Sequence, residues 1–119
     1  MIALRIVSLL AVASAPVGCH TEPTAATNGV LTVAHAPNAA FRLYNTGLGP
    51  VYYIAVEAGT AALINWAACD GPRCPSVPAQ DSVDLPYAQI SGYSVTAKEA
   101  TFFWWRSRAD SLRGFNVPF

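Results

Sequence analysis

Few residues of this chain are of the types that perform catalysis. A nucleophile needs a base within hydrogen-bond reach, and the usual base is histidine. His20 lies in a polar segment near the start of the chain, which leaves His35 as the histidine of the main body. Asp81 and Asp84 are three positions apart on a short alternating segment, so as strand residues they face opposite sides. Because no Gly-x-Ser-x-Gly, phosphate-loop or metal motif is present, we expect no enzymatic activity and no cofactor.

Two of the three cysteines lie close together in the sequence. Cys69 and Cys74 enclose the turn signal Gly71-Pro72, so their thiols can approach each other across a tight loop. In an oxidising compartment they would form a disulfide, which should stabilise the fold by about 2 kcal/mol. The competing interpretation is metal binding. The spacing is wider than in the usual zinc pair, however, and no second Cys/His pair accompanies it, so we expect a disulfide and no metal.

The third cysteine, Cys19, follows a segment typical of an export signal. Residues 1–5 carry one positive charge, residues 6–13 form a short apolar run, and small residues follow. The run is too short to cross a bilayer as a helix, which needs roughly 20 apolar residues, but it matches the apolar region of a secretory signal. We therefore expect residues 1–18 to be a cleaved signal peptide and the mature protein to be exported.

Two cleavage sites compete within this segment. The Ala-Ser-Ala at residues 13–15 has the form of an ordinary secretory site, but Pro16 would then follow the scissile bond, where its fixed φ is unfavourable. Cleavage before Cys19 is the alternative. The Val-Gly-Cys at residues 17–19 resembles the lipobox of bacterial lipoproteins, with Pro16 standing where that family usually has an aliphatic residue. The resemblance implies a lipid on Cys19 that holds the protein to a membrane of the cell envelope, outer or cytoplasmic, facing the periplasm or the exterior.

The remaining chain is long enough for one domain. Removal of the signal leaves about 100 residues, which suffices for a hydrophobic core. Residues 19–28 are polar and are expected to form a lipid-anchored tether, and residues 29–119 the folded domain. The formal net charge is zero and no basic run exists, so we expect no nucleic-acid partner.

The folded part consists of short alternating segments separated by turn residues. We expect strands at residues 30–33, 41–45, 51–57, 61–68, 81–85, 97–106 and 115–119, and therefore an all-β fold of about seven antiparallel strands. The succession FRLYN, VYYIAVE, INWAAC and TFFWWR resembles the strand rhythm of an immunoglobulin-like β-sandwich. The cysteine pair that links the two sheets of antibody domains is absent, because Cys69 and Cys74 are too close together.

Four consecutive aromatic residues, Phe102-Phe103-Trp104-Trp105, are the most distinctive feature of the expected strands. Alternation places Phe102 and Trp104 on one face and Phe103 and Trp105 on the other. The register with Leu43 favours Trp104 as the inward residue. The outward pair must then be covered by a loop, an edge or a partner, or else be exposed as a surface for ligands.

Other aromatic and basic residues bear on that choice. Tyr52 and Tyr53 are adjacent on a strand, so one of them should face outward beside an outward tryptophan. Candidate ligand-binding residues are therefore Tyr52, Tyr53, Phe103 and Trp105. Trp66, just before the cysteine loop, is expected to fill the core. The arginines at positions 106 and 108 either stack on an outward ring or lie in a solvated loop.

Two functions of different classes fit these observations. The first is a membrane-anchored interaction or structural module of the envelope with no chemistry of its own. The second is a ligand-binding or protease-inhibitor-type module that engages an envelope protein or a glycan through an exposed aromatic patch. The exposure of the outward aromatic residues discriminates between the two.

Overall fold

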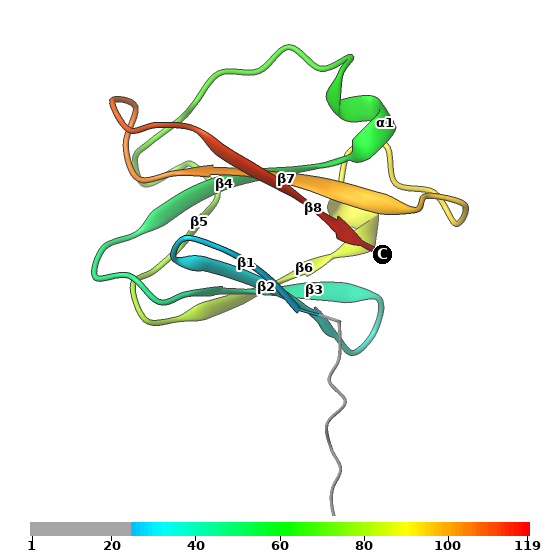
Figure 1. The fold of residues 1–119 in the computed structure, drawn as a ribbon, viewed down its shortest axis with the longest axis horizontal. Coiled ribbons are helices and arrows are strands. Elements are labelled where there is room, and N and C mark those ends of the chain that lie inside the picture. Colours follow the sequence, from blue (N-terminus) through cyan, green and yellow to red (C-terminus); the bar gives the residue numbers. More distant parts are fainter. Residues whose placement is uncertain (1–24) are drawn as a thin grey trace, which may run out of the picture.

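The computed structural model describes residues 25–119, so the expected signal peptide, Cys19 and most of the expected tether lie outside the described residues. Two four-stranded antiparallel sheets lie face to face, which confirms the predicted all-β class (Figure 1). The described part adds one short helix, α1 (Ala58–Ala61), and one 3-10 turn, η1 (Tyr87–Gln89).

The first sheet has the strand order β1-β2-β3-β6. Its strands are β1 (Ala25–Asn28), β2 (Leu31–Ala36), β3 (Ala40–Asn45) and β6 (Ser82–Pro86). The first three strands follow one another as hairpins. The fourth returns from the other sheet and pairs with β3, so this sheet combines near and distant parts of the chain.

The second sheet has the strand order β5-β4-β7-β8. Its strands are β4 (Val51–Glu57), β5 (Ser76–Val77), β7 (Glu99–Trp105) and β8 (Arg113–Pro118). The central pairing joins β4 to β7 across more than forty residues of chain, with Tyr52 opposite Trp105 and Tyr53 opposite Trp104.

The core lies between the sheets and follows the alternation of the strands. Leu31 and Leu43 face inward from the first sheet, and Phe102 and Trp104 face inward from the second. The other buried members of this cluster are Val33, Phe41, Val51, Val77, Leu85, Ile90, Ala100 and Val117. Inward alternation on both sheets is what makes the pair a sandwich.

Trp104 is the largest fully buried side chain, with no exposed surface, which confirms its predicted inward orientation. Its ring lies against Gly29 in the β1–β2 turn. Gly29 has a φ of 67°, and a Cβ there would stand 2.6 Å from ring carbon Cζ2. The turn therefore needs glycine both for its backbone conformation and for the space that the indole occupies.

Residues 61–68 do not form the predicted strand. The chain leaves β4 in a helical turn, because the Glu57 carboxylate accepts hydrogen bonds from the N–H groups of Gly59 and Thr60, each at 2.8 Å. The following alanine-rich stretch then crosses the second sheet without pairing to it (Figure 1). Few of its residues are β-branched, and the stretch lies over the face of the sheet, where Trp66 packs on Phe103 and Trp105, and not along the edge of a strand.

Two strands lie where the sequence predicted none, so residues 25–119 form eight strands. Residues 25–28, expected as the end of the tether, form β1 because the turn at Gly29 folds them back onto β2. The two-residue strand β5 lies inside an expected loop between two prolines. It pairs with Val51 and Tyr52 of β4. The two residues of β5 are therefore extended because they lie beside an edge of β4 that has no other partner there among residues 25–119.

Candidate functional site

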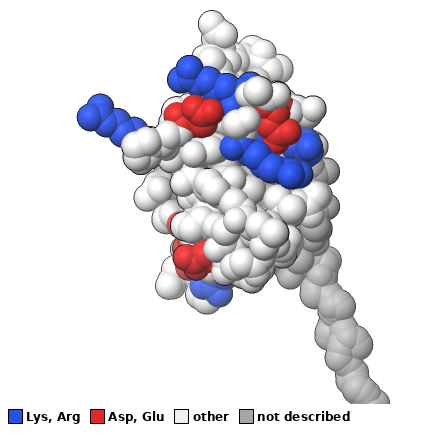
Figure 2. All heavy atoms as spheres, turned by 90° about the vertical axis from the view of Figure 1, so that its left-hand side faces the viewer, with Lys and Arg blue, Asp and Glu red and all other residues white. Residues whose placement is uncertain are grey.

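Four charged side chains gather at one end of the sandwich, in and beside the β7–β8 turn: Arg106, Arg108, Asp110 and Arg113. The β1–β2, β3–β4 and β7–β8 turns meet there, on the left in Figure 1. Viewed from that side, basic and acidic side chains crowd together toward the top (Figure 2). We call part of this region the arginine end and define it by Arg106, Arg113, Asp110 and the loop at residues 46–50.

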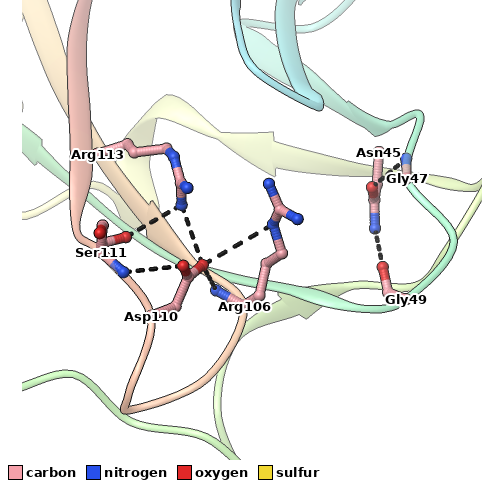
Figure 3. Close-up of polar contacts among 7 residues, drawn as sticks. All are labelled: Asn45, Gly47, Gly49, Arg106, Asp110, Ser111 and Arg113. Atoms are coloured by element: carbon pink, nitrogen blue, oxygen red, sulfur yellow. Dashed lines mark hydrogen bonds and ion pairs between the residues drawn. The ribbon is translucent and has the colours of Figure 1, made fainter.

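Asn45 holds the loop at residues 46–50 in place. Its side chain is fully buried at the end of β3, and all of its polar atoms find partners. Nδ2 donates to the carbonyls of Gly49 at 2.8 Å and Val77 at 3.0 Å, and Oδ1 accepts from the N–H of Gly47 at 2.8 Å (Figure 3). Gln80 braces the same loop by donating to the carbonyls at positions 46 and 47. The loop is thus rigidly supported from inside the protein.

Asp110 organises the β7–β8 turn. Its carboxylate accepts hydrogen bonds from the N–H of Arg106 at 2.9 Å, the N–H of Ser111 at 2.8 Å and the guanidinium of Arg113 at 3.0 Å. The backbone N–H of Arg106 is the main cause that lowers the pKa of Asp110, followed by the hydrogen bond from Arg113. Asp110 is therefore ionised at neutral pH and already well supplied with donors.

The two arginines beside Asp110 differ in how they are held. The Arg113 guanidinium lies 4.6 Å from the Trp104 ring centroid and bonds to Asp110. The Arg106 guanidinium lies 5.8 Å from the same centroid, and its Nε stands 3.8 Å from the Asp110 carboxylate. Figure 3 shows it between the Asp110 turn and the Asn45 loop. Arg106 is thus the less engaged of the two, with 56% of its side chain exposed.

A hollow of about 300 Å³ lies between these two loops. Its lining consists of Val30, Gly47, Leu48, Gly49, Val51 and Arg106. The first five offer aliphatic groups or glycine backbone, and Arg106 supplies the one charge of the lining. Such a surface can accept a small apolar group that carries an anion.

The predicted Cys69–Cys74 disulfide is present, with Cα atoms 5.9 Å apart. Because both sulfurs are in this bond, neither serves as a metal ligand. Asp70, inside the cysteine loop, accepts a hydrogen bond from the N–H of Arg108 at 2.9 Å and pairs with its guanidinium at 3.5 Å. The cysteine loop is thereby joined to the β7–β8 turn. Arg108 forms this ion pair and does not stack on an outward ring.

The outward face of the second sheet is covered by the segment before the disulfide. Trp105 points away from the core, as predicted, yet only 3% of it is exposed. Trp66 stacks on it at 5.4 Å between ring centroids and contacts Phe103 at 5.2 Å. The Trp105 Nε1 donates to the carbonyl of Cys69 at 2.8 Å. Trp66 is therefore a half-buried cover outside the sheet, and its predicted place in the core was wrong.

The four candidate ligand-binding residues do not form one exposed patch. Tyr53 faces the core, and burial raises the pKa of its hydroxyl. Tyr52 lies opposite Trp105 on the outward face and is half-buried. Phe103 and Trp105 lie beneath Trp66. A loop thus covers the outward aromatic pair, which was the first of the two arrangements predicted for it.

His35 lies at the opposite end of the sandwich. Its Nε2 donates to the carbonyl of Pro118 at 2.8 Å, which leaves Nδ1 as the acceptor for the Tyr87 hydroxyl at 3.4 Å. Both ring nitrogens are thus occupied by structural partners. Within residues 25–119 no three His, Cys, Asp or Glu side chains lie close enough together to hold a metal ion. The carboxylates of Asp81 and Asp84 have separate partners, the N–H of Ser82 and the guanidinium of Arg42.

Sequence reasoning missed Asn45 and did not single out the hollow. Asn45 shares the inward parity of Phe41 and Leu43, and it precedes a Thr-Gly turn. A polar residue at an inward position next to a turn is the signal that could have identified it as a loop anchor. Nothing in the sequence brings Arg106 beside residues 47–49, because that contact joins two loops almost sixty residues apart.

Comparisons with protein-family models, with curated protein sequences and with solved structures found no match to this chain. In the described part of the chain no helix is both long and apolar enough to cross a membrane.

Proposed function

We propose that this protein is an exported, lipid-anchored envelope lipoprotein whose domain is a non-enzymatic interaction module. In this proposal residues 1–18 are removed as a signal peptide and Cys19 carries the lipid. The domain holds no active site of its own. It presents the arginine end to a partner in the envelope, a protein or a glycan.

The observation that carries the proposal is the position at which the chain enters the sandwich. β1 begins at Ala25, which pairs with Ala34 near the end of β2, at the end of the sandwich that also holds the C-terminus (Figure 1). The arginine end lies at the other end. Cys19 and Ala25 are six positions apart, and a stretch of that length spans at most about 20 Å. A lipid on Cys19 would therefore hold the sandwich close to the membrane with the arginine end available to partners.

An immunoglobulin-like arrangement is part of this proposal. Pairing of β3 with β6 and of β4 with β7 corresponds to the B–E and C–F pairs of that fold. Strands β2 to β8 would then be A, B, C, C′, E, F and G. The chain departs from the pattern by the extra strand β1 and, among residues 25–119, by the lack of a strand on the free edge of β6.

The contacts of His35 support a domain without catalysis. Its two nitrogens bond to a backbone carbonyl and a tyrosine hydroxyl, so it activates neither a serine nor a cysteine in this arrangement. The aromatic alternative is not favoured, because Trp105 lies beneath Trp66 and offers little surface to a ligand.

The test of the proposal is the fate of Cys19. We expect the wild-type chain, expressed in a bacterial host, to incorporate a radiolabelled fatty acid and to fractionate with membranes. Cys19→Ala should lose the label and either leave the membrane or retain its signal. A chain with both Cys69→Ala and Cys74→Ala is the matched control and should keep the label. Equal labelling of the Cys19→Ala chain and the wild type would contradict the proposal.

A further inference from the structure

The hollow at the arginine end has the dimensions of a site for one amino-acid residue. Its volume of about 300 Å³ lies at the lower limit of ligand sites. Val30, Leu48 and Val51 give it aliphatic walls. Leu48 is 94% exposed at its rim, an unusual position for a leucine, and would be covered by an apolar occupant.

Arg106 supplies a cation that pairs only loosely with its neighbour Asp110. The Asp110 carboxylate already accepts the N–H groups of Arg106 and Ser111 and the guanidinium of Arg113. The Arg106 Nε stays 3.8 Å away, beyond hydrogen-bond length. Its terminal nitrogens have no hydrogen-bond partner among residues 25–119. A planar guanidinium with free donors matches a carboxylate, which it can bind through two parallel hydrogen bonds.

The loop beside Arg106 offers further donors in a fixed position. The N–H groups of Leu48 and Gly49, two lining residues of the hollow, form no hydrogen bond within the described part of the chain. Asn45 and Gln80 already hold this loop from the protein side, so little ordering is required on binding. Consecutive backbone N–H groups together with a cation are the means by which proteins capture the terminal carboxylate of a peptide.

We propose that this hollow binds the C-terminal residue of a partner polypeptide, an apolar residue whose carboxylate pairs with Arg106. The carboxylate accepts from the guanidinium and the loop N–H groups, and the side chain lies against Leu48 and the two valines. This inference deepens the interaction role and rests on the proposed function, because it names the partner chemistry of the arginine end.

The experiment is a titration of the isotopically labelled full chain in detergent micelles with N-acetyl-leucine, followed by NMR. We expect saturable shifts of the amide signals of Leu48 and Gly49 and of the Arg106 side-chain N–H. A ligand of this size should have a dissociation constant on the order of 1–10 mM. N-acetyl-leucinamide, which lacks the carboxylate, should bind about tenfold more weakly or worse.

Variants of the chain separate charge from apolar contact. Arg106→Gln should weaken binding at least about tenfold. Arg108→Gln, the matched control on the same turn, should leave binding unchanged because that arginine is paired with Asp70. Leu48→Ser should also weaken binding, and because this side chain is exposed it should leave the midpoint of unfolding unchanged. All variants are compared only after their unfolding midpoints have been measured.

Several outcomes would overturn the inference. The first is an absence of saturable shifts with N-acetyl-leucine up to about 50 mM, roughly the weakest affinity that such a site could use. The second is binding of N-acetyl-leucinamide as tight as that of N-acetyl-leucine. The third is a loss of binding in Arg108→Gln as large as the loss in Arg106→Gln. Isovalerate, a free branched carboxylate, tests the source of the ligand, and binding equal to that of N-acetyl-leucine would overturn the assignment to a peptide terminus. Acylation of Cys19 does not enter this measurement. A negative result here therefore leaves the Cys19 test standing, and failure of that test leaves this one interpretable.

Discussion

Replacement of Trp105 by alanine tests whether the segment at residues 62–75 is a structural cover of the second sheet. Trp105 lies on the outward face, where a tryptophan of a sandwich would ordinarily contribute little to stability. Here 3% of it is exposed, it stacks on Trp66, and its Nε1 donates to the Cys69 carbonyl at 2.8 Å. Trp105→Ala removes all three contributions at once.

The expected cost follows from these contacts. Truncation of a buried tryptophan to alanine costs about 3–5 kcal/mol. We expect about 3 kcal/mol for Trp105→Ala, because the covering segment can partly collapse into the space. Trp104→Ala should cost about 4–5 kcal/mol, because that ring is enclosed by two sheets and Gly29. Trp105→Phe keeps an aromatic stack and loses the N–H donor, so it should cost roughly 1 kcal/mol.

The assay is urea denaturation of the full chain followed by far-ultraviolet circular dichroism. Hydrogen exchange of the amides in residues 62–75 is measured alongside and should accelerate in Trp105→Ala but not in Trp105→Phe. A loss below about 1 kcal/mol for Trp105→Ala, the size of an ordinary surface substitution, would refute the reasoning. It would mean that the cover contributes nothing and that Trp105 is in effect a surface residue.

Three further predictions follow from single contacts. Gly29→Ala should destabilise the domain by about 2–3 kcal/mol, because the added Cβ would overlap the Trp104 ring and the φ of residue 29 is positive. A melting temperature within about 2 °C of the wild type, which corresponds to roughly 0.5 kcal/mol for a domain of this size, would contradict this prediction. Reduction of the disulfide should cost roughly 2 kcal/mol and leave the domain folded, and a reduced chain that has lost its circular dichroism signal in buffer would show that the estimate is too low. Because its folded-state pKa is lowered, Asp110 contributes stability that is complete above its unfolded pKa of about 4 and is lost as pH falls through the lower folded value. In Asp110→Asn the free energy of unfolding should therefore fall less steeply as the pH is lowered below about 4 than it does in the wild type. An equally steep fall in the two proteins would mean that other carboxylates cause the acid sensitivity.

Much of the fold can be predicted from patterns among neighbouring residues in the sequence. The alternation of Phe41 and Leu43, of Tyr52 and Tyr53, and of the aromatic run 102–105 was sufficient to predict strands and faces, because successive strand residues point to opposite sides. The inward position of Trp104 followed from the same rule. The disulfide followed from a turn between two nearby cysteines, a relation that needs no tertiary information.

Other features depend on which elements meet in space. The alternation of β7 placed Trp105 outward, but only the path of residues 62–75 decided that Trp66 would bury it. The same path explains why residues 61–68 are not a strand, since a segment lying across a sheet has no edge to pair with. β5 is a strand only because β4 offers it a partner.

The candidate site, too, depends partly on local sequence and partly on long-range packing. The sequence by itself determined that Arg106 follows an aromatic strand and that residues 46–50 form a turn, since both are properties of a few adjacent residues. Only the tertiary structure decided that the guanidinium and the loop share a hollow, because β3 and β7 end, and β4 begins, at the same end of the sandwich. It also decided that Asp110 is satisfied by other donors and leaves Arg106 loosely held. Local pattern specifies what each residue can do, whereas long-range packing selects which residues act together.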